Sequence, residues 1–243
     1  MKGKAIFSLL YAIVLLLGFA CYSSAANHVD NIWRSNRILR DIQRQYGLEA
    51  RERVIQWKRL IETNQSATDA EKLDRVNQFF NQFDFVDDSI HWGMTDYWAT
   101  PLETLVTNGG DCEDFTLAKY LTLRSLEVPE TRMRLSYVKS LTLNQPHMVL
   151  AYYPTADSEP LLLDNLVTTV QPASSRPDLI PVYSFNGRGL WLTKQRRREE
   201  KVEIYVGSDR QLGLWQEFLQ RLHTEQERDW GFISPALAAP PPR

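Results

Sequence analysis

Apolar residues recur at three- and four-residue intervals between about residues 29 and 83, and this spacing predicts helices. We expect one helix over about 29–46 and a second over about 48–64. A third helix is predicted to begin at Thr68, because Thr68 and Glu71 have the spacing of a capping box. The apolar face of this helix carries Leu73, Val76, Phe80 and Phe83.

The pattern changes further along the chain. Residues 85–110 are rich in aromatic and turn-forming residues and are expected to form a long ordered loop, and a fourth helix is predicted from Cys112 to about Glu127. Three later stretches rich in Leu, Val and Tyr predict strands: RMRLSYVKSL, HMVLAYYP and PLLLDNL. The next residues contain Pro and Gly and are expected to be irregular, before a final amphipathic helix in RQLGLWQEFLQRLH. Helices followed by strands predict an α+β domain.

The N-terminus has the pattern of a secretory signal peptide. Two lysines precede an apolar run that ends near Cys21, and small residues follow up to Ala26. We therefore predict a signal peptide over 1–26, cleaved after Ala26. The alternatives are a retained membrane anchor, because the run is close to spanning length, and a lipoprotein, for which GFAC is a poor signal. The remaining chain predicts one domain over 27–230 and a disordered tail over 231–243.

The charge balance narrows the class of partners. The sequence has 28 basic and 30 acidic residues, so its formal charge is −2, and removal of the two leader lysines (28 − 2 = 26 basic) makes it −4. A weakly acidic chain does not favour general binding to nucleic acid or to an anionic membrane. We therefore expect no nucleic-acid partner, and the protein is not an integral membrane protein if the leader is cleaved.

One cysteine, Cys112, is left once the leader with Cys21 is removed. Exported proteins usually contain cysteines in pairs, so a lone thiol needs an explanation. Cys112 stands at the predicted start of a helix, after Gly109 and Gly110, which would allow a tight turn. A helix N-terminus lowers the pKa of a thiol, so this position favours a reactive cysteine. The alternative is a buried, inert cysteine.

Two further residues complete a candidate catalytic triad. His147 opens the predicted strand HMVLAYY, and Asp164 lies in the otherwise apolar strand LLLDNL. An imidazole can activate a thiol as a nucleophile, and a carboxylate can orient the imidazole. Taken singly, His147 could be a structural residue at a strand edge, and Asp164 could belong to a turn. A Cys at a helix start, a His on a strand and an Asp in the next strand together favour a cysteine nucleophile.

Segment 96–123, DYWATPLETLVTNGGDCEDFTLAKYLTL, resembles the bacterial transglutaminase-like cysteine proteinases. The W-x-x-P-x-E-x-L pattern leading to GGDCEDF is specific for that family, and HMVLAYY and LLLDN also fit it. The resemblance extends over about 30–223. It implies a papain-like, transglutaminase-like cysteine protease fold, with N-terminal helices and a catalytic helix packed on an antiparallel sheet. It also implies that Cys112, His147 and Asp164 are the catalytic residues.

The same resemblance implies calcium as a cofactor. It implies that Asp111 and Glu113, on either side of the nucleophile, bind the ion, with Asp114 as a third ligand. Carboxylates are the oxygen ligands that calcium prefers. Three unneutralised carboxylates should raise the pKa of the thiol, and a bound cation would cancel that effect. The alternative is that the acids only complement the dipole at the helix N-terminus.

The function that the resemblance implies is that of a periplasmic, calcium-dependent cysteine endopeptidase. The implied substrate is the N-terminal region of a large repeat adhesin, cut near a pair of alanines to release the adhesin and disperse a biofilm. The implied regulator is an inner-membrane cyclic di-GMP receptor, whose periplasmic domain sequesters the protease. Two alternatives keep the same fold: acyl transfer to an amine, as in a transglutaminase or amidase, and a non-catalytic binding module. An intact triad argues against the module.

Overall fold

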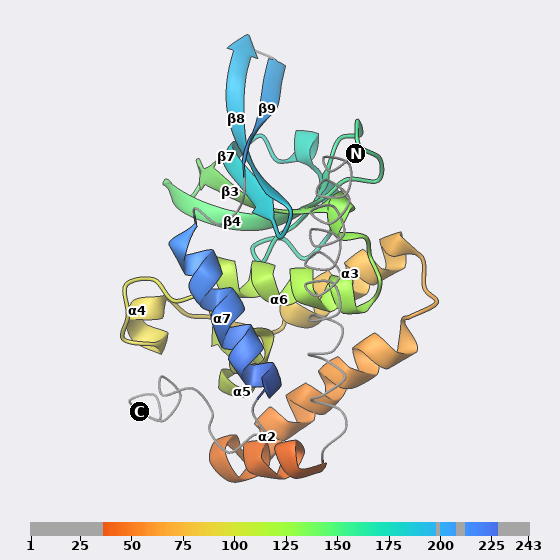
Figure 1. Ribbon diagram of the computed structural model, residues 1–243, viewed down its shortest axis with the longest axis vertical. Helices are drawn as coiled ribbons and strands as arrows, with labels where there is room; N and C mark the ends of the chain where they lie inside the picture. Colours follow the sequence, from red (N-terminus) through yellow and green to blue (C-terminus); the bar gives the residue numbers. More distant parts are fainter. Residues whose placement is uncertain (1–35, 198–199, 208–211, 228–243) are drawn as a thin grey trace, which may run out of the picture.

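The computed structural model describes residues 36–197, 200–207 and 212–227. These residues form a layer of helices that covers one face of a seven-stranded antiparallel sheet (Figure 1). The strand order is β6-β5-β4-β3-β7-β8-β9. This architecture confirms the predicted α+β class. The predicted signal peptide over 1–26 and the predicted tail over 231–243 lie outside the described residues.

The N-terminal helices follow the predicted pattern. Helix α2 spans Asn36–Thr63 and is broken at Gly47, whose φ of 89° and ψ of 177° lie in a region that favours glycine. The break between the first two predicted helices is therefore confirmed. Helix α3 spans Asp69–Phe80 and begins with the predicted capping box. The Thr68 hydroxyl accepts from the Glu71 N–H, and Thr68 N donates to the Glu71 carboxylate at 2.9 Å.

The prediction of a long loop over 85–110 is wrong, because this segment contains helix α4 (Asp88–His91) and helix α5 (Pro101–Thr107). Thr100 caps α5 through its hydroxyl, and Thr100 N donates to the Glu103 carboxylate at 2.8 Å. A helix of seven residues is too short for helical periodicity to emerge. Only the capping box and the proline in the first turn could have predicted it.

The three predicted strands are present as β3 (Met133–Ser140), β4 (Gln145–Tyr152) and β5 (Leu161–Leu163). Strands β3 and β4 form a hairpin over their whole length, and β5 pairs with the second half of β4. Strand β5 is shorter than predicted, so Asp164 follows the strand instead of lying inside it.

The region expected to be irregular contains three further long strands, so that prediction is wrong. They are β7 (Leu179–Asn186), β8 (Gly189–Arg197) and β9 (Glu200–Gly207). A register shift in the pairing of β3 with β7 brings Pro181 opposite Val138. A bulge of this kind interrupts the two-residue period, which hides the strand from a pattern search. The shorter elements are β6 (Gln171–Pro172) and the 3₁₀ turns Glu130–Arg132 and Ala173–Ser175.

Helix α6 (Cys112–Ser125) packs against β4 and β3 (Figure 1). Thr116 Oγ1 donates to the Met148 carbonyl at 3.0 Å and so ties the helix to β4. The final predicted helix is present as α7 (Gly213–Glu227), which buries Trp215 and Phe218 in the same core. This packing confirms the helix-on-sheet arrangement and brings the N-terminus of α6 beside β4.

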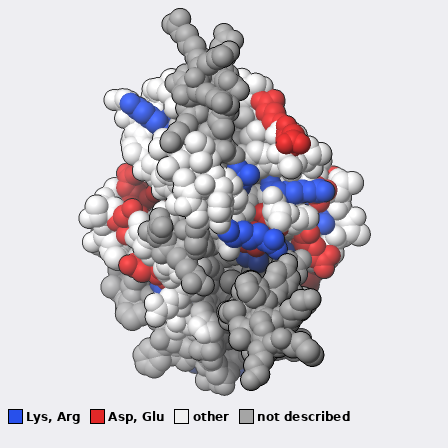
Figure 2. Space-filling model, turned by 45° about the horizontal axis from the view of Figure 1, so that its top comes forward, with Lys and Arg blue, Asp and Glu red and all other residues white. Residues whose placement is uncertain are grey.

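The surface gives no sign of a single strongly charged face in the view of Figure 2. The described Lys and Arg side chains gather near the middle of this face, with Asp and Glu to either side. None of the described helices combines the length and the apolar composition that crossing a bilayer requires.

Candidate active site

Cys112 is the first residue of α6, as predicted, and Asp111 is its N-cap. The Asp111 carboxylate accepts from Glu113 N at 3.3 Å, and Asp111 N donates to Asp114 Oδ2 at 3.3 Å. The helix therefore begins with a capping box formed by two aspartates. The Cys112 side chain is half-buried and its thiol donates to Glu113 Oε2 at 2.7 Å. The backbone N–H of Met148, on β4, donates to the same sulfur.

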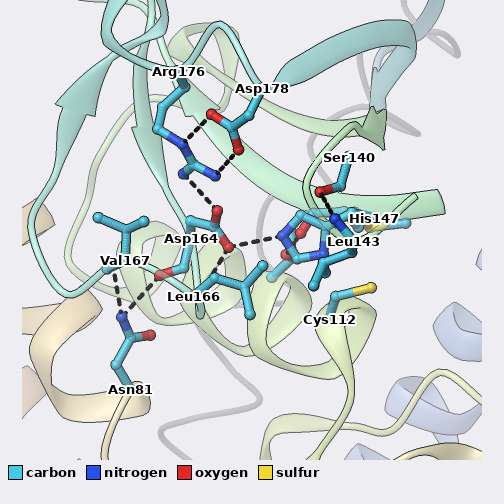
Figure 3. A network of polar contacts seen from close by, with 12 residues as sticks. Asn81, Cys112, Ser140, Leu143, His147, Asp164, Leu166, Val167, Arg176 and Asp178 are labelled. Carbon is cyan, nitrogen blue, oxygen red and sulfur yellow. Dashed lines mark hydrogen bonds and ion pairs between the residues drawn. The ribbon is translucent and has the colours of Figure 1, made fainter. Parts of the chain in front are cut away.

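His147 and Asp164 form a buried pair. His147 Nε2 lies 2.8 Å from Asp164 Oδ1, and the two residues are 2% and 1% exposed (Figure 3). The imidazole comes from β4 and the carboxylate from the residue after β5, two adjacent strands of the sheet. Because Nε2 is used by Asp164, Nδ1 is the ring nitrogen left for a thiol. This is the arrangement that a carboxylate-oriented imidazole base requires.

Asp164 is held from several sides besides His147. Leu166 N donates to Oδ1 at 3.0 Å, Arg176 Nη1 donates to Oδ2 at 2.6 Å, and Asn81 Nδ2 donates to the Asp164 carbonyl at 2.8 Å. Burial alone would raise the pKa of Asp164, but the bonds from His147, Leu166 and Arg176 outweigh burial and lower that pKa to about 2. Asp164 is therefore ionised at neutral pH.

Cys112 lies beside β4, where its sulfur contacts Met148, the residue after His147. The thiol is hydrogen-bonded to Glu113 and not to the His147 imidazole. In Figure 3 the Cys112 side chain lies next to His147, and its sulfur points away from the ring. Burial raises the pKa of the Cys112 thiol, and the nearby charges of Glu113 and Asp111 raise it further. A protonated thiol that donates to a carboxylate is the expected state while the acids around it are not neutralised.

Acidic side chains cluster at the start of α6. Asp88, Asp111 and Asp114 each offer a carboxylate oxygen within 4.8 Å of the others, and Asp111, Glu113 and the Cys112 sulfur form a second group within the same distance. The three acids predicted from the sequence therefore fall in two groups that share Asp111. Asp88 was not predicted: it is the first residue of α4, 24 positions before Cys112 (112 − 88 = 24), and no spacing in the sequence relates it to α6.

The crowding of these acids changes their proton affinity. Burial raises the pKa of Asp88 to about 6, with smaller contributions from Glu113 and other neighbouring acids. Burial also raises the pKa of Asp111, to about 10, together with the charges of Glu113, Asp114 and Asp88. Burial is also the main cause that raises the pKa of Asp114. Carboxylates that cannot all ionise beside one another are a group that a cation would stabilise.

The donor set fits a hard divalent cation. Asp88 Oδ1 is buried without a hydrogen-bond partner among the described residues, while its other oxygen accepts from Tyr97 N. A buried, unpartnered carboxylate oxygen is costly unless a proton or a cation satisfies it. Asp88, Asp111 and Asp114, with Glu113 at the rim, supply the oxygen donors that calcium prefers.

The glycine pair before Cys112 does not form the predicted tight turn. Gly109 and Gly110 are the two residues of β2, which pairs in parallel with β1 (Asp84–Phe85). Glycine is required there by close approach: a Cβ on Gly109 would lie 2.6 Å from the Asp84 carbonyl oxygen, and one on Gly110 would lie 2.3 Å from Asp114 Oδ2. Gly110 thus makes room for the Asp114 carboxylate, and Gly109 for the backbone of β1.

Together, a thiol at a helix start, a buried imidazole–carboxylate pair on the adjacent sheet and a helix-on-sheet fold define a cysteine peptidase of the transglutaminase-like type. The family model described as bacterial transglutaminase-like cysteine proteinase matches residues 48–193, and the chain belongs to this family. It is therefore a cysteine peptidase.

Solved structures of LapG from Legionella pneumophila have the same fold. The EGTA-treated form is 44% identical, with a TM-score of 0.65, over 76% of this chain and 97% of that chain. The calcium-bound form is 43% identical, with a TM-score of 0.64, over the same shares of the two chains. No curated protein matches the chain significantly.

Proposed function

We propose that this protein is a calcium-dependent cysteine endopeptidase that uses Cys112, His147 and Asp164. The observation that carries the proposal is the buried His147–Asp164 pair beside the helix that begins with Cys112. In the reaction, the Cys112 side chain first turns from Glu113 toward the imidazole, and its thiol proton then passes to His147 Nδ1. The thiolate then forms a bond to the scissile carbonyl carbon.

The same residues complete the cycle. His147 returns its proton to the leaving amine as the peptide C–N bond breaks, and water then hydrolyses the thioester at Cys112. Asp164 holds the imidazole in the tautomer and orientation that these transfers need. The backbone N–H of Cys112, at the positive end of α6, contributes to the oxyanion hole.

We further propose that calcium binds at the acid cluster, with Asp88, Asp111, Glu113 and Asp114 as the residues that hold it. The support is the unpartnered Asp88 oxygen, the crowding of carboxylates and the 43% identity to a LapG that is calcium-bound. The bound cation would supply positive charge that cancels the carboxylates next to the Cys112 thiol.

Replacing Gly110 with alanine tests this placement of the cation. The new Cβ overlaps the Asp114 carboxylate, so Asp114 must move, and calcium affinity is expected to fall at least about 10-fold. Isothermal titration with CaCl₂ measures the change. Gly213→Ala is the matched control, because a Cβ at Gly213 meets no atom within 4 Å. Equal calcium affinities in both variants and the wild type would remove Asp114 from the site.

The proposed substrate is the N-terminal region of a large repeat adhesin, cut near a pair of alanines to release the adhesin and disperse a biofilm. The proposed regulator is the periplasmic domain of an inner-membrane cyclic di-GMP receptor, and the proposed location is the periplasm. Support comes from the resemblance of the motif blocks to the family and from the signal-peptide pattern over 1–26.

Cleavage of an adhesin fragment tests the substrate. Residues 27–243 in calcium are expected to cut the N-terminal fragment of an adhesin from the same genome once, at the alanine pair, as read by mass spectrometry. A fragment with both alanines changed to valine is the control. An enzyme that hydrolyses other peptides but leaves the fragment intact would refute the substrate. Incorporation of a fluorescent amine into a glutamine peptide, without hydrolysis, would point instead to acyl transfer.

A further inference from the structure

Arg176 lies next to the candidate triad, although no sequence pattern relates it to the catalytic residues. It follows the 3₁₀ turn Ala173–Ser175, and its guanidinium reaches the carboxylate of Asp164 (Figure 3). The contact joins Arg176 Nη1 to Asp164 Oδ2 at 2.6 Å, and the side chains are 8% and 1% exposed. This is a buried ion pair on the oxygen that His147 does not use.

The guanidinium is itself fixed in orientation. Arg176 Nε donates to Asp178 Oδ1 at 3.0 Å, and Nη2 donates to Asp178 Oδ2 at 2.9 Å, so the two groups form a bidentate pair. Pro177 lies between the two residues and restricts the backbone that joins them. A bidentate fork leaves the arginine one geometry, in which Nη1 points at Asp164.

The charges around the pair come from several elements. Lys119 from α6, and Arg176 and Asp178 from the segment before β7, act on the charge of Asp164. The Cys112 side chain, from α6, lies next to His147 (Figure 3). Lys119 is 1% exposed; burial lowers the pKa of its amine to about 7, and the charge of Asp164 opposes that change. Arg176 is thus a permanently charged group in direct contact with the triad carboxylate.

We propose that Arg176 is a positioning residue for catalysis: it holds the carboxylate of Asp164 in the plane that His147 requires and offsets part of its negative charge. His147 and the Leu166 N–H contact Oδ1 of this carboxylate, and Arg176 contacts Oδ2. Without Arg176, Asp164 could rotate, and its uncompensated charge would stabilise the imidazolium form of His147. The inference rests on the proposed triad.

A role in stability alone does not account for the arrangement as well. Buried ion pairs are weak evidence for stability, since desolvation offsets much of their attraction. The pair with Asp178 already compensates the charge of the guanidinium. The additional contact to the oxygen opposite His147 serves the orientation of the carboxylate, and an effect on the imidazole is what distinguishes the two roles.

The variant Arg176→Met tests the proposal. We expect kcat on a peptide substrate in saturating calcium to fall about 10- to 100-fold with little change in KM, because a misplaced carboxylate misplaces the base. We also expect the basic limb of the kcat/KM profile to move to higher pH, because the imidazolium is then stabilised. Arg132→Met is the matched control: it removes an arginine paired with Asp69 on the surface, away from His147.

The conservative variant Arg176→Lys separates charge from geometry. We expect it to return the basic limb to the wild-type pH, because it restores the cation, and to recover only part of kcat, because an ammonium cannot form the fork. An unchanged pH profile and kcat in a folded Arg176→Met protein would overturn the proposal, and so would a loss of thermal stability with no shift of the basic limb. Either result is distinct from failure of the triad, in which Cys112→Ala keeps its activity.

Discussion

Replacing Cys112 with alanine is expected to lower kcat for peptide cleavage by at least about 10⁴-fold, to the level of any contaminating activity. The reason is that the reaction has no other nucleophile: residues 27–243 contain one thiol, and it lies at the start of α6 beside the strand that carries His147. The measurement is the initial rate of hydrolysis of a peptide or adhesin fragment in calcium.

The fold of this variant should survive, because the Cys112 side chain is only half-buried and loses one atom. We expect its free energy of unfolding to change by about 1 kcal/mol or less, as measured by denaturant titration. Calcium binding should also persist, since no carboxylate is removed. Hydrolysis at the wild-type rate by Cys112→Ala would eliminate Cys112 as the nucleophile.

Removal of calcium is expected to stop turnover and to destabilise the protein. At a calcium concentration 100 times the dissociation constant, the ion should stabilise the fold by about 2.7 kcal/mol. The physical reason is that Asp88, Asp111 and Asp114 otherwise share a buried site as competing acids. Activity and the midpoint of thermal unfolding are measured in EGTA and again after excess CaCl₂ is added.

Asp88→Asn tests the proposed calcium ligand that the sequence did not suggest. We expect its affinity for calcium to fall about 10- to 100-fold, because the site loses one carboxylate charge. Asp87→Asn is the matched control: it removes the same charge from the neighbouring residue, which is exposed and makes no capping hydrogen bond. Turnover and unfolding that do not respond to EGTA would contradict the calcium proposal, and equal affinities in the two variants would exclude Asp88.

The elements predicted correctly from the sequence are those with a regular apolar pattern over many residues or with a local capping signal. The box from Thr68 to Glu71 starts α3, and a run of apolar residues identifies α6 and the hairpin of β3 and β4. Helix α5 was missed because seven residues are too few for a helical period. Strand β7 was missed because a bulge and Pro181 interrupt its alternation.

The residues of the candidate site are likewise of two kinds, those that are close in the sequence and those that only the fold brings together. Asp111, Glu113 and Asp114 are consecutive neighbours of Cys112, so one stretch of sequence is enough to bring them together. Asp88 and Arg176 reach the site through tertiary packing, from α4 and from the turn before β7. The identities of these two residues carry no local signal, and only the folded chain shows that one completes the acid cluster and the other contacts Asp164.

The rate at which iodoacetamide alkylates Cys112 at pH 7 tests the central claim most directly, because residues 27–243 contain no other thiol. We predict labelling at least about 10-fold faster in calcium than in EGTA, and a loss of that acceleration in His147→Ala, since the cation and the imidazolium both favour the thiolate. Equal rates in calcium and EGTA, or full acceleration in His147→Ala, would contradict the account of this cysteine as a nucleophile activated by its imidazole neighbour.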